Sequence, residues 1–449
     1  MPTIPPAVDP LLETTDWPRL FHAYGWATDT PAHLRALLSD NPAAHKAALD
    51  HLNSAVIHQG TAWTCTAPAA LIVANLLSNP RLIAIDDSIV GTTPAKPPKT
   101  VTDGFAELQN FRATIGATAR ETTPPPLSAQ LLSFLNEVAQ VFPNSGATIA
   151  ELEKLAAAPT PALDKLISAH TVKADSSDDE NEDDEGAFEE LFEDEETSNA
   201  LYARAILECV NIRAPLLEKI LPCLTAPHGE TRAAAAETIA TLASQISPPP
   251  QLADITSRLT AAARAAATPC ERAAHILALG KLTPAAPAVT APWLDDPAPA
   301  VRLCAALAPA QATNPRATQL LHEALSQHAA EIETWFTPRP PQFSMHARFY
   351  LLDALLARTS TLEEILPAAL ALIPRAKKDT VDYEWGKLLA RAFPPAAATQ
   401  PLTPARREFL AALTANTPLW DTHFGNPRRW FAKAALPYDR DACLRLLAT

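Results

Sequence analysis

Glycine is scarce in this chain: 11 of its 449 residues are glycine, against 44 prolines. Neither G-x-G-x-x-G nor the Walker A pattern occurs, which excludes the common glycine-rich loops that bind phosphate groups. Aromatic residues make up 6% of the chain and β-branched runs are rare, so no large β-sheet is expected. Because glycine costs about 1 kcal/mol in a helix interior relative to alanine, this alanine-rich and glycine-poor sequence favours helices.

The sequence also lacks metal-binding and disulfide motifs. The six cysteines stand singly with no C-x-x-C pair, which predicts buried free thiols, no zinc site and no disulfide framework. No H-E-x-x-H occurs, and His45, His51 and His58 are spaced six and seven residues apart, so they share no tight helical face. We therefore expect neither a metal nor another cofactor.

Long hydrophobic runs are missing as well. The longest apolar run, Ala67 to Leu77, is too short to cross a bilayer, which takes about 20 residues. The N-terminus lacks the basic-then-apolar pattern of a signal peptide. With 47% hydrophobic residues the chain is expected to be a folded, soluble, cytoplasmic protein without a membrane partner. Its length predicts several domains or a repeat array.

The prolines mark helix starts. Pro42, Pro269 and Pro297 each follow a residue that commonly caps helices, which places them at the first helical position, where a missing N–H is not needed. After Pro42, apolar residues at helical spacing continue to Val56, Gly60 fits the position just past that helix, and Thr61 is a candidate cap for a helix running to Ser78.

These patterns predict an all-α protein in three parts. Residues 1–174 form an N-terminal helical section with a Pro/Lys-rich loop at 86–104, residues 175–196 an acidic segment, and residues 197–449 a C-terminal repeat section. The predicted helices lie at 105–119, 127–141, 148–157, 161–170, 197–212, 215–225, 229–245, 250–266, 269–282, 297–310, 314–328, 343–358, 361–373, 380–393, 404–415 and 438–448.

A motif recurs in the C-terminal section. Thr231-Arg232-Ala233-Ala234, Glu271-Arg272-Ala273-Ala274 and Val301-Arg302-Leu303-Cys304 are spaced 40 and 30 residues apart, which brackets the helix-pair repeats of α-solenoids. With its acidic and proline-rich start, Asp295–Ala312 resembles a HEAT repeat best. His228–Ser244 and Pro269–Leu282 resemble it less closely, and Asp40–Val56 in the N-terminal section is a looser copy. The resemblance implies an α-solenoid of antiparallel helix pairs, in which the motif arginine pairs with the acidic group that starts its own or an adjacent repeat, as Arg302 with Asp295 or Asp296.

The acidic segment carries the net charge. Residues 175–196 contain 14 Asp and Glu and no Lys or Arg, and without them the chain has 36 acidic and 36 basic residues. Such a block is a solvated loop, a docking element for a basic partner, or a latch on the protein's own C-terminal region, where residues 370–449 have a net charge of +5. Its candidate partner-binding residues are Asp178, Asp179, Glu180, Asp183, Asp184, Phe188, Leu191 and Phe192; at helical spacing the last three would share one face.

A second cluster lies near the C-terminus. Gly425 and Asn426-Pro427 predict a turn, beside which Arg428, Arg429 and Trp430 are further candidate partner-binding residues, suited to an anion or a stacked base. The competing interpretation is a Trp/Phe-rich cap that covers the apolar end of the repeat array. Asp421 and His423 have no nucleophile at a recognisable spacing, so no catalytic site is expected.

The expected function is therefore non-enzymatic protein binding, through a solenoid groove, the acidic segment, or both. The concentrated negative charge also suggests a more specific alternative, an immunity-type inhibitor that neutralises a basic effector. A third alternative is a HEAT-like DNA glycosylase, a nucleic-acid-acting enzyme that would need a basic groove, and no basic stripe follows the repeats. The expected partner is a protein, basic if the acidic segment binds it, and no nucleic acid is expected.

Overall fold

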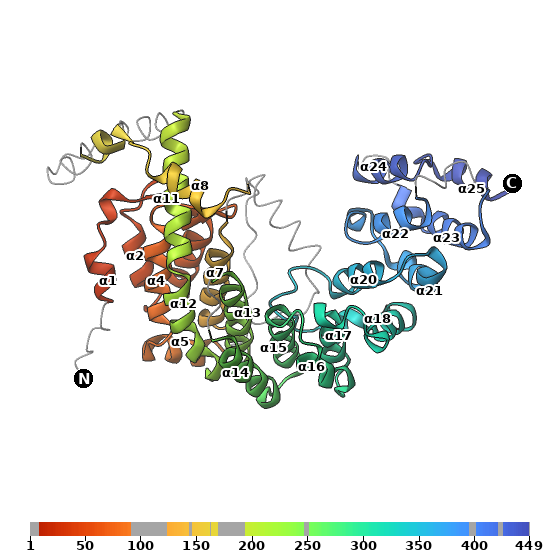
Figure 1. The fold of residues 1–449 in the computed structure, drawn as a ribbon, viewed down its shortest axis with the longest axis horizontal. Helices are drawn as coiled ribbons and strands as arrows, with labels where there is room; N and C mark the ends of the chain where they lie inside the picture. The colour runs from red at the N-terminus through yellow and green to blue at the C-terminus, as the bar shows by residue number, and fades with distance from the viewer. Residues whose placement is uncertain are drawn as a thin grey trace. The chain divides into compact units, whose positions relative to one another are not determined.

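The computed structural model describes residues 9–90, 124–142, 146–161, 163–168, 194–246, 251–394, 401–420 and 425–448, and they are mostly helical (Figure 1). They form two compact units. Unit 1 takes the described residues of Met1–Pro94 and Thr123–Ala262, and unit 2 those of Ala263–Thr449. The units do not divide at the acidic segment, because helices from both sides of residues 175–196 pack together in unit 1.

The first part of unit 1 alternates short helices with two small hairpins. Its elements are α1 Pro10–Thr14, η1 Trp17–Arg19, β1 Phe21–His22, β2 Gly25–Trp26, α2 Thr30–Ala36, α3 Pro42–His51, the π-helical turn η2 Leu52–Val56, β3 Ile57–His58, β4 Thr61–Ala62, α4 Thr66–Leu76 and α5 Pro80–Val90. Both two-stranded sheets are antiparallel, with Phe21 opposite Trp26 and Ile57 opposite Ala62.

The hairpin of β3 and β4 corrects the predicted end of the first helix. Gln59 and Gly60 have φ values of +53° and +80°, so they form a tight hairpin turn, and Gly60 does not end a helix. Thr61 lies in β4 and caps nothing. Instead the buried Thr66, the first residue of α4, accepts from the Trp63 backbone N–H and donates to the Val56 carbonyl, at 2.8 and 2.6 Å.

The rest of unit 1 is a helical layer around α7. It comprises α7 Leu127–Gln140, α8 Ile149–Ala156, α11 Glu195–Asn211, α12 Arg213–Ile220, η3 Leu221–Thr225, α13 Gly229–Gln245 and α14 Leu252–Ala265, which runs into unit 2. Helix α7 packs against α4, α5 and α13, and its Leu131, Leu132, Phe134 and Leu135 are fully buried. Helix α8 packs along α11.

Unit 2 is a succession of helices in chain order. Its elements are α15 Pro269–Leu282, α16 Pro287–Thr290, η4 Ala291–Asp295, α17 Pro299–Leu307, η5 Pro309–Gln311, α18 Pro315–Gln327, α19 Ile332–Trp335, α20 Ala347–Arg358, α21 Leu362–Leu372, η6 Ile373–Arg375, η7 Lys378–Thr380, α22 Trp385–Ala392, α23 Pro404–Ala415, η9 Thr417–Trp420, α24 Gly425–Lys433 and α25 Arg440–Ala448.

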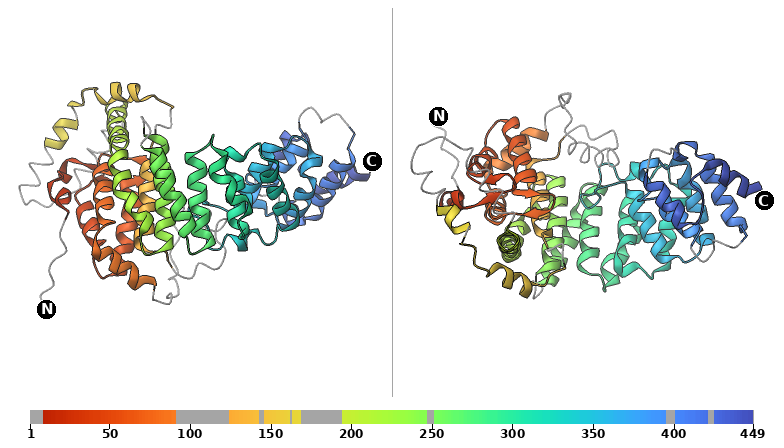
Figure 2. Two further views of the ribbon diagram at one scale, coloured as in Figure 1. Left: turned by 60° about the horizontal axis from the view of Figure 1, so that its bottom comes forward. Right: turned by 90° about the horizontal axis from the view of Figure 1, so that it is seen from above.

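The main contacts of unit 2 also follow the chain. Helix α15 packs on α17, α17 on α18, α18 on α20 and α21, α21 on α22 and α23, α22 on α24, and α23 on α25. Figure 2 shows the same succession from green to blue. Small residues permit close approach: a Cβ at Gly280 would lie 3.0 Å from that of Ala308. Each helix therefore buries its apolar face mainly against neighbours close in sequence.

Two of the three predicted proline starts are correct. The Asn41 side chain accepts from the Ala43 N–H and Thr268 from the Glu271 N–H, and in each case proline follows the cap. The third is wrong, because α17 begins at Pro299 and Pro297 precedes it. The Asp296 carboxylate accepts from the Ala298 N–H at 2.9 Å, which shapes the turn before the helix.

Other predictions near the gaps have mixed outcomes. The predicted loop at 86–104 begins too early, because α5 runs to Val90. The rest of that loop and the predicted helix at 105–119 lie outside the described residues, and of the predicted helix at 161–170 the helical residues 161 and 163–168 are described. Among the described helices no single one is long and apolar enough to cross a membrane; α4 and Pro80–Ser88 meet that test together, but are bent by 75°.

Candidate functional site

The predicted acidic binding residues lie outside the described part of the chain, from Asp178 to Phe192, so their arrangement remains a prediction. The end of the segment is described. Helix α11 begins at Glu195, two residues earlier than predicted, and Asp194 caps it by accepting from the Thr197 N–H at 3.2 Å. Hydrogen bonds from the Thr197 hydroxyl and N–H lower the pKa of Asp194. The acidic segment is thus joined directly to a capped helix of 17 residues.

The predicted C-terminal turn is wrong, because Gly425–Lys433 forms helix α24. Proline at the third position is tolerated there, since the first helical turn needs no N–H donors. The Trp430 indole N–H donates to one Asp382 oxygen at 2.6 Å, and the Asn426 amide donates to the other at 2.7 Å. Both residues anchor α24 to the segment that precedes α22.

The Trp430 ring is occupied by packing. A Cβ at Gly386 would lie 2.6 Å from this ring, and Lys433 Nζ lies 4.9 Å from its centroid. Close by, Trp420 stacks on Tyr438 and meets the buried Phe431 edge-on. Of the three predicted residues on α24, Arg428 and Arg429 are exposed, whereas Trp430 is half-buried and faces the helix beneath it.

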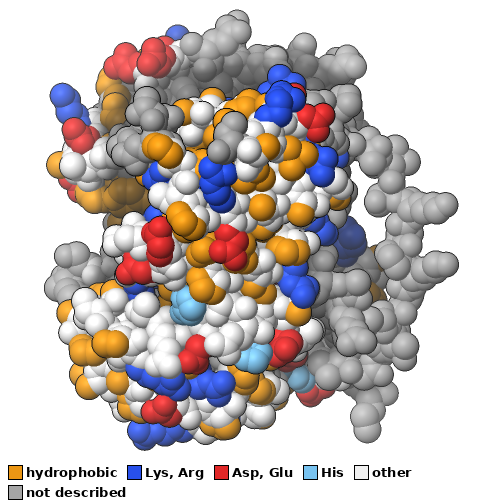
Figure 3. Space-filling view, turned by 90° about the vertical axis from the view of Figure 1, so that its right-hand side faces the viewer, with side chains coloured by type: hydrophobic (Ala, Val, Ile, Leu, Met, Phe, Trp, Pro, Cys, Tyr) orange, Lys and Arg blue, Asp and Glu red, His pale blue; other side chains and the backbone are white. Residues whose placement is uncertain are grey.

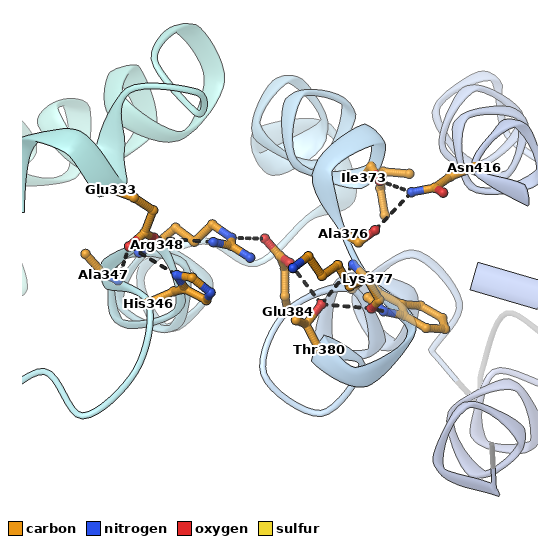
Figure 4. Close-up of polar contacts among 11 residues, drawn as sticks. Glu333, His346, Ala347, Arg348, Ile373, Ala376, Lys377, Thr380, Glu384 and Asn416 are labelled. Carbon is orange, nitrogen blue, oxygen red and sulfur yellow. Dashed lines mark hydrogen bonds and ion pairs between the residues drawn. The ribbon is translucent and has the colours of Figure 1, made fainter. Parts of the chain in front are cut away.

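A hollow of about 680 Å³ lies beside this cluster and is lined by Pro374, Ala376, Lys377, Lys378, Asp379, Asn416, Thr417, Pro418 and Trp420. Asn416 donates to the Ile373 and Ala376 carbonyls and closes one wall (Figure 4). The lining has one carboxylate and two lysines, and neither histidine nor cysteine, so it offers no imidazole and no thiol nucleophile.

Sequence analysis did not identify a buried ionic network in unit 2. Arg348 lies between two carboxylates: its Nε donates to Glu384 at 2.8 Å, and its Nη1 donates to Glu333 at 3.3 Å (Figure 4). Glu333 also pairs with His346 at 3.2 Å, and Thr380 donates to Glu384 at 3.2 Å. The Glu384 side chain is fully buried, and this burial raises its pKa against the opposing effect of Arg348.

Seven arginines of unit 1 and unit 2 bind helix ends. Guanidinium groups donate to backbone carbonyls at or just past helix C-termini, where four carbonyls have no partner within the helix. The pairs are Arg204 with Ala156 and Ala158, Arg213 with Val141, Arg358 with Ala306, Arg391 with Leu356 and Thr359, Arg406 with Ala392, Arg407 with Leu447, and Arg440 with Thr414. Figure 3 shows Lys/Arg and Asp/Glu interspersed among the described side chains of one face, without a band of one sign.

The arginines of the repeated motif make the same contact. Arg232, Arg272 and Arg302 each donate to the carbonyl six residues earlier, at 2.6, 3.4 and 2.7 Å. The predicted pairing of a motif arginine with the acidic group at the start of its own or an adjacent copy occurs between adjacent copies, whereas Arg302 itself binds the Asp296 backbone carbonyl. Arg272, from the preceding copy, binds the Asp296 carboxylate at 3.0 Å.

Five of the six cysteines are buried, as predicted, and the sixth, Cys270, is partly buried. Burial raises the pKa of Cys209 to about 12 and those of Cys223 and Cys443 to about 11. Burial also raises the pKa values of Cys65 and Cys304. These thiols remain protonated near neutral pH and are poor nucleophiles.

A histidine and carboxylate cluster in unit 1 was missed by sequence analysis. It joins His22 at the end of β1, Asp29 just before α2, and His51 at the end of α3. His22 Nε2 lies 3.1 Å from Asp29 Oδ1, and His51 Nδ1 lies 3.8 Å from Asp29 Oδ2. Both imidazoles are about 7% exposed, whereas the Asp29 side chain is 52% exposed.

The neighbours of this cluster fix its two rings. The Tyr24 backbone N–H donates to His22 Nδ1 at 3.1 Å, and Thr30 Oγ1 lies 2.9 Å from His51 Nε2. The His33 ring stacks on His51 at 4.2 Å. Burial lowers the pKa of His51 to about 4, with Asp29 opposing and His33 and His22 adding to the shift, so this imidazole is neutral near pH 7.

The arrangement can hold a cation or a shared proton between imidazoles and a carboxylate. No local spacing revealed it, because residues 22, 29 and 51 come from three elements that meet only in the folded chain. The available signal was weak: an aspartate at a helix start with histidines on both sides of it in sequence. Comparison of the chain with protein-family models, curated protein sequences and solved structures finds no match.

Proposed function

We propose that this protein is a non-enzymatic protein-binding scaffold, an α-solenoid of HEAT-like helix pairs that uses its acidic segment to dock a basic partner. The observation that carries the proposal is the distribution of charge. All of the net charge of −14 resides in residues 175–196, and the remainder is balanced at 36 acidic and 36 basic residues. A charge concentrated in this way attracts a partner of opposite sign to one place on the chain.

The architecture of unit 2 supports the solenoid. Its helices pack on their sequence neighbours from α15 to α25, which is how repeat proteins bury faces that a lone helix pair leaves exposed. The shared contact of Arg232, Arg272 and Arg302 with the sixth preceding carbonyl supports a structural repeat. An array of this kind presents long surfaces for a protein partner.

The use of polar groups supports binding over catalysis. The described arginines that bind helix carbonyls serve the fold, which disfavours a nucleic-acid groove that would need those charges facing phosphates. The buried cysteines are protonated, and the hollow beside Trp420 has neither a histidine nor a cysteine in its lining. These observations favour recognition by the surface and the acidic segment.

The point of attachment supports docking. The segment ends at Asp194, which caps α11, and α11 packs against α4, α7 and α8 in the core of unit 1. A partner that binds a charge block joined to a packed helix is held close to the body of the protein. A partner that binds a block between long uncharged linkers would not be held there.

A capture experiment tests the proposal. The intact chain and a chain lacking residues 175–196 are used as bait in extracts of the source cells, at ionic strengths of about 0.02 and 0.2 M, since screening lengths fall from about 20 to 7 Å over this range. We expect basic proteins that bind the intact chain at low salt, and that are lost on deletion and at high salt. Capture that is unaffected by deletion would refute docking by the acidic segment.

A further inference from the structure

We propose that His22, Asp29 and His51 form a binding site for one divalent transition-metal ion, for which Zn²⁺ has the best-matched chemistry. The site offers two imidazole nitrogens and one carboxylate oxygen, a set that suits Zn²⁺ and related ions, whereas Mg²⁺ and Ca²⁺ prefer oxygen ligands alone. The ligand atoms of all three residues lie within 4.8 Å of one another. The site is independent of the proposed partner binding.

The distances match a coordination sphere. Bonds of about 2.0–2.1 Å around a tetrahedral Zn²⁺ place neighbouring ligand atoms roughly 3.4 Å apart. The measured separations, 3.1 Å from His22 Nε2 to Asp29 Oδ1 and 3.8 Å from His51 Nδ1 to Asp29 Oδ2, bracket that value. The two imidazole nitrogens lie within 4.8 Å of each other, so an ion between the three groups would draw their side chains closer together.

One side of the site is buried and held by neighbouring residues, and the other side is open to solvent. The two rings are buried and oriented by neighbours, His51 by its contact with Thr30 and by stacking on His33. The Asp29 side chain is half exposed, which gives an ion a route from solvent and leaves room for water as a fourth ligand. Three protein ligands leave one position of a tetrahedral zinc ion free for water.

The orientation of Asp29 is a second observation. Aspartate is a preferred N-cap, yet Asp29 stands at the start of α2 without a side-chain hydrogen bond to the helix. Its carboxylate instead faces the two imidazoles, one oxygen toward each. The helix therefore forgoes its cap, and the carboxylate is held in the position of a metal ligand.

Metal binding has one identifiable cost, which provides a marker. Because the Tyr24 N–H donates to His22 Nδ1, the neutral His22 ring carries its proton on Nε2, facing Asp29. An ion at Nε2 moves that proton to Nδ1, so the Tyr24 N–H loses its acceptor. Tyr24 is 63% exposed and lies in the two-residue turn between β1 and β2, so this change remains local.

The test uses the full-length chain, purified with a tag free of histidine and stripped with a chelator. Zn²⁺ is titrated by calorimetry, Co²⁺ is added to read coordination from its visible absorption, and Mg²⁺ serves as the hard-ion control. The variants are Asp29→Asn and His22→Gln. The control is His45→Gln, since His45 is also buried on α3 but binds the Ser39 carbonyl and lies outside the cluster.

We expect one Zn²⁺ per chain, an intense Co²⁺ spectrum, and no Mg²⁺ binding. Asp29→Asn and His22→Gln should weaken Zn²⁺ binding by at least about tenfold, and His45→Gln should leave it unchanged. Zn²⁺ should also speed hydrogen exchange at the Tyr24 amide. If the wild-type chain binds no Zn²⁺, the proposal is overturned whether or not the variants fold. Equal Zn²⁺ affinities in all variants would also overturn it. The cluster would then be a hydrogen-bonded core contact.

Discussion

Removing the Arg348 guanidinium should lower the stability of unit 2. The loss should be larger than the loss expected when an exposed ion pair is broken. Arg348→Met keeps an unbranched side chain of similar length but leaves Glu384, which is fully buried, without its cation. Breaking a buried pair on one side costs about 3–5 kcal/mol, because the remaining charge has lost both its partner and its water. Glu333 retains His346 and two backbone N–H donors, so most of the loss arises at Glu384.

The loss should depend on pH in a defined direction. Burial already raises the pKa of Glu384, and loss of Arg348 removes an effect that opposes that rise. A carboxyl group with a raised pKa in the folded state stabilises the fold at low pH, and this contribution is lost as pH rises through the folded-state pKa. The deficit of Arg348→Met should therefore be largest at pH 7 and smaller near pH 5.

Native-state hydrogen exchange in α20 and α22 measures this opening free energy. The control is Lys387→Met, which breaks the 2.6 Å pair with a 52% exposed Asp353 and should cost less than about 1 kcal/mol. Adding Glu384→Gln to Arg348→Met should recover part of the deficit, since a neutral amide is cheaper to bury. An Arg348→Met deficit below about 1 kcal/mol, or one that is the same at both pH values, would show that buried Glu384 does not depend on the Arg348 cation.

Three further outcomes are expected. Gly386→Ala places a Cβ 2.5 Å from the Val381 carbonyl oxygen and should lower unfolding stability by about 1–3 kcal/mol, whereas Gly425→Ala, with open space around it, should have little effect in the same urea titration. Thiol labelling at pH 8 should modify Cys270 first and the five buried cysteines only in denaturant; rapid labelling of all six would contradict their burial. Arg391→Ala removes bonds of 2.8 and 2.6 Å to carbonyls at the end of α20 and should speed amide exchange there, with no change in α25.

Local signals made much of unit 2 predictable. The predicted bounds 229–245, 269–282 and 404–415 match α13, α15 and α23, where a cap or a polar start is followed by regular apolar spacing. The prediction that Pro297 begins a helix was wrong, because a proline after aspartate also suits the turn before a helix. The prediction that Gly60 lies just past a helix end was wrong for a related reason. Helix ends and tight hairpin turns both need a residue with positive φ, which glycine supplies.

The candidate sites depended on distant residues and could not be predicted. His22 and His51 meet because the end of β1 lies against the segment after α3, where the Ala23 backbone N–H donates to the Ala55 carbonyl at 3.0 Å, and hairpins as short as that of β1 and β2 leave little periodic signal. Arg348 and Glu384 are likewise 36 residues apart in sequence and become partners only when α20 packs beside the start of α22. Sequence patterns report faces and caps well, but they do not report which faces meet.

The most direct test of the account is the affinity of a captured basic partner for the intact chain and for a variant in which the acidic side chains of residues 178–184 are changed to amides. Calorimetric titration at ionic strengths of about 0.02 and 0.2 M separates charge attraction from other contacts. We expect affinity that falls with salt for the intact chain, and weaker binding with a smaller salt dependence for the variant. Equal affinity of the two chains at both salt concentrations would contradict it.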